Sequence, residues 1–166
     1  MKRLFFILNI FLLVSCSSDD EVRTNTKDVV GVWEKSSDIS TEIYPELEEG
    51  NYEFVLQYKF LDDSTFESFS FVRNSDTDNI IGYRSRFEGS FFIEKNRMNL
   101  NYNQYNSNVE ASQLVDSADL VLIDQDVDWS FNFSVNKNEL LFDFDPCGPY
   151  ADCIGELKLK RVKKNQ

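Results

Sequence analysis

Apolar and polar residues alternate with a period of two in short runs along most of the chain after residue 29. Because successive side chains of a strand point to opposite faces, each run predicts a β-strand with one buried and one solvated face. The clearest runs cover residues 52–60, 66–72, 89–93, 98–103, 129–135, 140–145 and 157–160. No long segment has the helical period, so the sequence predicts an all-β domain.

The connections between these runs are short and have turn chemistry, as in residues 61–65 (LDDST) and 136–138 (NKN). Consecutive strands joined by tight turns predict an antiparallel meander. A meander with one apolar face packs on a second layer or closes on itself, and closure removes the exposed edges. We predict eight to nine strands closed into a barrel, one domain over residues 29–166, with irregular segments at 37–51 and 104–118.

The N-terminus has the pattern of a secretory signal, with Lys2 and Arg3 followed by the apolar residues 4–14. As a helix this run would span roughly 16 Å, about half of the hydrocarbon core of a membrane. It ends in Leu-Val-Ser-Cys, which resembles a bacterial lipobox. The pattern predicts a signal peptide over residues 1–15 and lipidation of Cys16. The alternative is that Cys16 merely ends the signal and the mature protein is free.

The segment after Cys16 begins Ser-Ser-Asp-Asp-Glu, and residues 16–28 are polar without periodicity. The acidic start resembles the export signal of surface lipoproteins in Bacteroidota, and the alternative is a solvated acidic tether. The resemblance implies a protein that is lipid-anchored to the bacterial outer membrane and exposed at the cell surface.

The chain is strongly acidic, with a formal charge of −12. Residues 1–15 hold two basic and no acidic residues, so the mature chain would stand at −14. No basic stripe is available to bind nucleic acid through its phosphates. A surface of this charge also repels anionic lipid headgroups, so we expect membrane contact through the anchor alone.

Two further cysteines, Cys147 and Cys153, bracket the sequence GPYAD. Exported compartments permit disulfides, and a bridge here would close a short loop. The alternative is half of a metal site, although the chain contains no histidine and no second cysteine pair. The spacing favours the disulfide.

Three segments resemble the lipocalins and the lipocalin-like domain lipoproteins common in Bacteroidota. Gly31-Val32-Trp33 resembles their G-x-W signature, residues 86–102 resemble a central hairpin, and residues 155–162 resemble the last strand. The resemblance implies a barrel in which Arg161 lies over Trp33 at the closed end, as a cation–π contact. The alternative is a core tryptophan and a solvated terminal arginine.

Catalytic chemistry has little support in the sequence. The chain has no histidine, no G-x-S-x-G motif and no glycine-rich phosphate loop, so we predict neither an enzyme nor a cofactor. Asp124, Asp126 and Asp128 alternate and would repel on one strand face unless solvated or holding a cation. They are weak candidates for Ca²⁺, against the alternative of a solvated loop.

A small barrel holds one small ligand or is filled by side chains. Five aromatic residues are candidates for the lining of a ligand pocket, with core packing as the alternative: Tyr58, Phe69, Phe91, Phe131 and Phe142. The leading hypothesis is binding of a small apolar or amphipathic molecule. The alternative is a non-catalytic interaction or structural module with a filled barrel, which contacts a protein or glycan through loop tyrosines at positions 44, 105 and 150.

Overall fold

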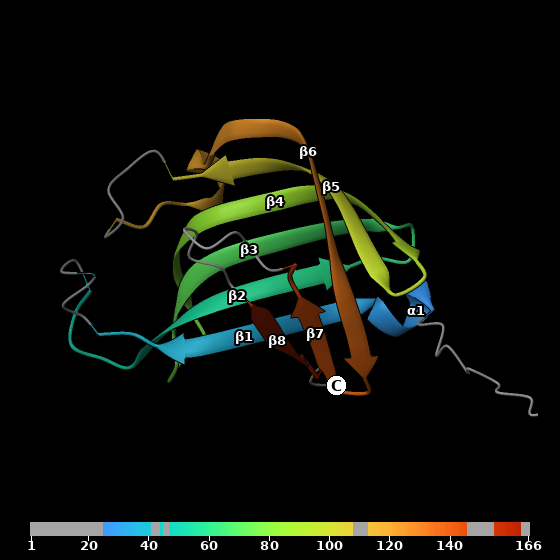
Figure 1. Cartoon of the computed structure of the whole chain (residues 1–166). Coiled ribbons are helices and arrows are strands. Elements are labelled where there is room, and N and C mark those ends of the chain that lie inside the picture. Colours follow the sequence, from blue (N-terminus) through green and yellow to red (C-terminus); the bar gives the residue numbers. More distant parts are fainter. Residues whose placement is uncertain (1–24, 41–43, 45–46, 108–112, 146–154, 164–166) are drawn as a thin grey trace, which may run out of the picture.

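Eight strands follow one another around the barrel in chain order, and the last pairs with the first (Figure 1). The computed structural model describes residues 25–40, 44, 47–107, 113–145 and 155–163. The strands are β1 (Gly31–Asp38), β2 (Tyr52–Phe60), β3 (Thr65–Asn74), β4 (Ile80–Glu94), β5 (Arg97–Asn106), β6 (Val121–Asn136), β7 (Glu139–Asp143) and β8 (Glu156–Arg161). All neighbouring pairs are antiparallel. The predicted all-β closed meander is therefore confirmed.

The barrel closes at one end only. β1 pairs with β2 over eight positions, from Gly31 opposite Phe60 to Asp38 opposite Glu53. With β8 it pairs at just two, Trp33 opposite Arg161 and Glu34 opposite Lys160. The short strands β7 and β8 reach only this end, whereas β2 to β6 continue beyond it, as Figure 1 shows. We call the end with the β1–β8 pairing and the β2–β3, β4–β5 and β6–β7 turns the closed end, and the opposite end the open end.

The main core fills the barrel near the closed end with aromatic and aliphatic side chains from all eight strands. Rings touch throughout it, with centroids 4.7 Å apart for Phe131 and Phe142 and 4.9 Å apart for Phe60 and Phe91. A smaller cluster at the open end joins Tyr44, Tyr52 and Val72. Among the long strands, β2 and β3 contribute buried side chains to both clusters.

Two strands extend well beyond the alternation that predicts them. β4 begins at Ile80 rather than residue 89, and β6 begins at Val121 rather than residue 129. These added segments mix exposed aliphatic and charged side chains, so their sequence shows no apolar face. Register shifts beside them, at Ser70/Phe71 and at Tyr102/Gln104, also interrupt the period of two.

The segment just before β1 is helical, whereas the sequence analysis assigned residues up to 28 to the tether. α1 (Thr26–Val29) begins with a capping box between Asn25 and Asp28. The Nε1 of Trp33 donates to the carbonyl of Val29 at 2.7 Å, which ties this turn to the barrel. The other helix is a 3₁₀ turn, η1 (Ser117–Asp119). Within the described residues, no helix is long and apolar enough to cross a membrane.

Candidate functional site

The residues of the expected closed-end signature meet as the lipocalin resemblance implies. The guanidinium of Arg161 lies over the indole of Trp33, 4.0 Å from the ring centroid. It also donates to three backbone carbonyls, those of Val30 at 2.9 Å, Asp28 at 2.6 Å and Lys137 at 3.1 Å. Arg161 is therefore not a solvated terminal residue. It joins α1, the start of β1 and the β6–β7 turn.

Gly31 is required at this junction for two reasons. Its φ is +139°, a conformation that residues with a side chain rarely adopt. A Cβ atom there would also lie 2.7 Å from Nη1 of Arg161. Because the arginine donors are directed at backbone carbonyls and its face at the indole, the arrangement stabilises the barrel end rather than supplying chemistry.

Four of the five candidate pocket residues lie inside the packed core. Tyr58, Phe91, Phe131 and Phe142 are at most 4 % exposed and contact other rings. Burial raises the pKa of Tyr58 to about 12, as expected for a phenol in an apolar interior. The closed half of the barrel is thus filled at these positions.

The fifth candidate, Phe69, points to the other face of the sheet. Its neighbours Ser68 and Ser70 are buried, so alternation directs Phe69 away from the core. Its ring instead contacts that of Tyr83, with centroids 5.8 Å apart. Phe69 therefore does not share a site with the other four.

A partly exposed apolar surface lies beside the packed core, at the point where β7 ends. Trp129 stacks on Phe144 with centroids 4.8 Å apart and an interplanar angle of 3°. It also contacts the buried Phe131 at 5.0 Å, yet 37 % of Trp129 is exposed. Leu56, Phe87 and Val127 are half-buried against the same core. We call Trp129 and Phe144 the aromatic ledge.

Hydroxyl groups line the inner face of β3. Ser68 is 1 % exposed and lies opposite Tyr58 in the β2–β3 ladder, where its hydroxyl interacts with the phenol. The hydroxyls of Ser70 and Ser85 lie 2.6 Å apart and bond to each other. Buried hydroxyls that pair with one another avoid the cost of an unsatisfied polar group. The interior therefore offers polar as well as apolar contacts.

The outer wall over β5 carries an open groove of about 280 Å³. Phe92, 60 % exposed, lies beside the amides of Asn99 and Asn101. Asn101 donates to the carboxylate of Asp128 at 3.0 Å, which fixes both side chains. An exposed ring next to amide and carboxylate groups offers the two kinds of contact that a sugar uses, apolar ring faces and paired hydrogen bonds.

The three aspartates of residues 124–128 do not form a metal site. Asp126 has a φ of +51°, and the adjacent register shift breaks their alternation. The Asp124 carboxylate accepts from the backbone of Gln125, and that of Asp128 accepts from Asn101. No group of three His, Cys, Asp or Glu that could hold a metal ion occurs among the residues that the structure describes.

The tyrosines proposed as exposed loop contacts lie elsewhere. Tyr44 is buried, 6 % exposed, in the open-end cluster. Tyr105 belongs to β5, where Arg86 covers its ring at 4.2 Å and its hydroxyl donates to Glu88. Tyr150, Cys147, Cys153 and the lipidation candidate Cys16 lie outside the described residues.

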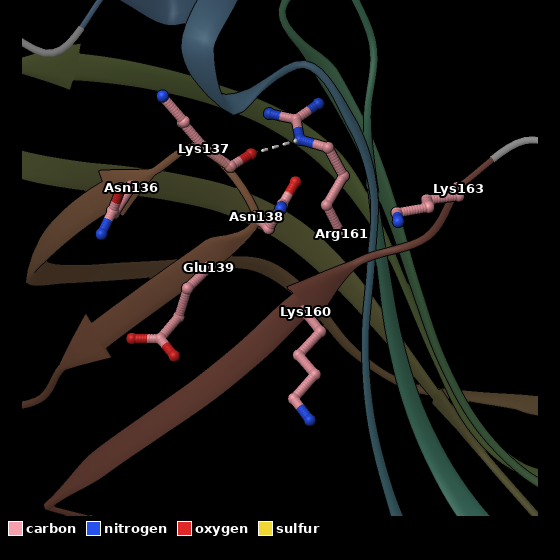
Figure 2. Close-up of a pocket in the computed structure, with 7 residues that line it drawn as sticks. All are labelled: Asn136, Lys137, Asn138, Glu139, Lys160, Arg161 and Lys163. Atoms are coloured by element: carbon pink, nitrogen blue, oxygen red, sulfur yellow. Dashed lines mark hydrogen bonds between the residues drawn. The ribbon is translucent and has the colours of Figure 1, made fainter.

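A basic pocket at the closed end was missed in the sequence, because it joins the β6–β7 turn to the residues after β8 (Figure 2). Its volume is about 540 Å³, and its lining residues are Asn136, Lys137, Asn138, Glu139, Lys160, Arg161 and Lys163. Only the antiparallel return of β8 brings these two segments together. The overall negative charge gives no sign of it.

Comparison with known proteins identifies no relative from which a function of these residues could be inferred. No protein-family model matches the sequence, and no curated protein matches it. The fold and the geometry of the described residues therefore carry the functional argument.

Proposed function

We propose that this protein is an exported lipoprotein that binds a small apolar or amphipathic molecule at the aromatic ledge. In this proposal Cys16 carries the lipid that anchors it to the bacterial outer membrane, on the cell surface. The protein acts as a binding protein without catalysis. Support comes from the N-terminal pattern for the anchor and from the exposed face of Trp129 for the ligand.

The observation that carries the ligand proposal is the exposure of Trp129. Trp129 stacks in parallel on Phe144 and packs on Phe131, so its side chain is already held rigidly. Ligand binding therefore costs little further side-chain entropy at Trp129. The filled core below limits the ligand to a molecule that lies across the ledge rather than one enclosed by the barrel. The hydroxyl-lined inner face of β3 suits a ligand with a polar group.

We expect Trp129→Ala to weaken binding of an apolar dye such as Nile red about five-fold or more, since loss of a stacked aromatic contact costs on the order of 1–3 kcal/mol. Ile80→Ala is the control, because it removes an exposed apolar side chain from β4 that lines neither the ledge nor the groove beside Phe92, which Trp129 also lines. Dye fluorescence measures both affinities. Equal affinities for the two variants would contradict the proposal, and native mass spectrometry of protein from its own host would identify the ligand.

The anchor has its own test in the intact mass of protein extracted from host membranes. We expect a mature chain that begins at Cys16 and carries a diacylglyceryl thioether and an acylated amine. Cys16→Ser should abolish the modification and release the protein from the membrane fraction. A mature chain with an unmodified Cys16 would contradict the anchor without bearing on the ledge.

The groove beside Phe92 favours a second candidate function, contact with a glycan. We expect Phe92→Ala to abolish binding of oligosaccharides on a glycan array and Ile80→Ala, outside the groove, to leave that binding unchanged. Because Trp129 also lines the groove, Phe92→Ala rather than Trp129→Ala is the variant that tests the glycan candidate. Retention of glycan binding by Phe92→Ala would contradict this second candidate.

A further inference from the structure

The basic pocket at the closed end is positively charged, although the protein as a whole is negatively charged. Lys137, Lys160 and Lys163 are exposed, and none of the three makes an ion pair with a described residue. Arg161 adds a fourth positive charge, and Glu139 is the one acidic residue among those that line the pocket. Figure 2 shows the side chains of Lys137 and Lys163 on either side of Arg161, with Glu139 and Lys160 below them.

The remaining charges of the closed end do not cancel this pocket. Lys27 and Lys95 roughly balance Asp62 and Glu94 in the other segments of this end. The carboxylates of Asp28 and Asp63 accept from backbone amides and keep their charge, so these segments stand at 2 − 4 = −2 against 4 − 1 = +3 for the residues that line the pocket. Most of the excess negative charge of the chain therefore lies elsewhere. At physiological salt, charges more than about 8 Å away are largely screened, so the local balance decides what the pocket binds.

The same end of the barrel is where the chain leaves toward its N-terminus. Asn25 caps α1, and Arg161 binds the carbonyls of Asp28 and Val30 while it also borders the basic pocket. Eight residues lie between Cys16 and Asn25, so the fully extended chain from one to the other reaches at most about 30 Å. A lipid on Cys16 would hold the closed end, rather than the open end, within that distance of the bilayer.

We propose that the closed end docks on the phosphate groups of the membrane that carries the anchor, through Lys137, Lys160 and Lys163. This inference rests on the proposed lipidation of Cys16, which keeps the lysines close to the surface at a high effective concentration. It goes beyond the expectation from net charge, in which the anchor alone contacts the membrane. Docking directs the long strands and the open end away from the bilayer.

Three exposed lysines have enough electrostatic attraction to orient an anchored protein. Each lysine near an anionic surface raises the equilibrium constant for docking about five-fold. Three lysines together therefore favour the docked orientation on the order of a hundred-fold. Arg161 is left out of this set because its donors hold backbone carbonyls. Replacing the lysines should therefore change the orientation without opening the barrel.

The test measures the orientation of the lipidated mature protein on vesicles of phosphatidylcholine with or without phosphatidylglycerol. A fluorophore is placed at Asn96→Cys in the β4–β5 turn of the closed end, or at Ser75→Cys in the β3–β4 turn of the open end. Lipids with a spin label on the headgroup quench a fluorophore that lies close to the surface. The parent chain, without either added cysteine, gives the background labelling.

On anionic vesicles we expect several-fold stronger quenching at position 96 than at position 75, and loss of the difference at about 0.5 M salt. The difference in quenching should also disappear in the triple variant Lys137→Gln, Lys160→Gln, Lys163→Gln. A control with the same net charge, Lys35→Gln, Lys59→Gln, Arg86→Gln, should keep it, since these residues lie outside the pocket.

Equal quenching at the two positions, or an unchanged difference in the triple lysine variant, would overturn the docking proposal. Protein that washes off neutral and anionic vesicles alike would instead refute the lipid anchor, and with it the proposed function. Thermal unfolding followed by circular dichroism verifies that both triple variants keep the fold.

Discussion

Replacing Gly89 with alanine is expected to destabilise the protein by about 3 kcal/mol or more, or to prevent folding altogether. A Cβ atom at this position would overlap the backbone oxygen of Asn101 and lie 2.7 Å from Cα of Tyr102. Both atoms belong to β5, which pairs on both sides with neighbouring strands. A backbone in that position cannot move away without disturbing both ladders.

The matched control is Gly155→Ala, because a Cβ built on that residue meets no atom of the described residues within 4 Å, its own chain neighbours aside. Its stability should stay within about 0.5 kcal/mol of the parent protein. Urea unfolding, followed by far-ultraviolet circular dichroism, gives the two free energies. Similar losses for both variants would show that the tight contact between β4 and β5 is absent in solution.

Removing Arg161 should have the second-largest effect. We expect Arg161→Ala to cost about 2–4 kcal/mol, since three carbonyls lose a charged donor and the indole of Trp33 loses its cover. Arg161→Lys should recover only part of this loss, because an ammonium group cannot reach three carbonyls in one plane. Lys160→Ala, one residue earlier and exposed, is the control and should change stability by less than about 0.5 kcal/mol.

A double-mutant cycle isolates the contact between the two side chains. Arg161→Ala and Trp33→Phe, alone and together, should give a coupling free energy on the order of 1 kcal/mol. Urea unfolding supplies all four values. A coupling of zero would mean that Arg161 acts through the carbonyls alone, and that the ring contact adds nothing to stability.

Alternation in the sequence predicts the fold best where a strand has one buried and one solvated face. In β2, five apolar residues from Tyr52 to Phe60 are spaced by two and three of them are buried, although Val55 on the opposite face is buried as well. In the first half of β6 the same rule fails, because Val121, Leu122 and Ile123 are all exposed and no face is selected. A strand that continues past the core is held by its ladder bonds, which leave no signal in side-chain polarity.

The candidate site could be predicted only in part, since it depends on residues that are distant in sequence. The pairing of Trp33 with Arg161 follows from motif resemblance. The sequence does not predict which aromatic residues are buried in the core and which stay partly exposed. Trp129 and Phe131 are both aromatic and both point inward, but the last β6–β7 pair, Asn132 with Asp143, lies next to Phe131, which Phe142 of β7 contacts, and three residues from Trp129. Which aromatic remains exposed depends on strand length, which alternation alone does not determine.

The two-position seam between β1 and β8 also has a consequence for the order of events in folding. Every other ladder joins neighbouring strands and forms from locally connected chain, whereas this seam joins residues 33 and 161. The closing contacts, and those of Arg161 with the helix at the start of the domain, require almost the whole polypeptide. During synthesis from the N-terminus, β1 to β6 can form early, but the barrel closes only when β8 has been made.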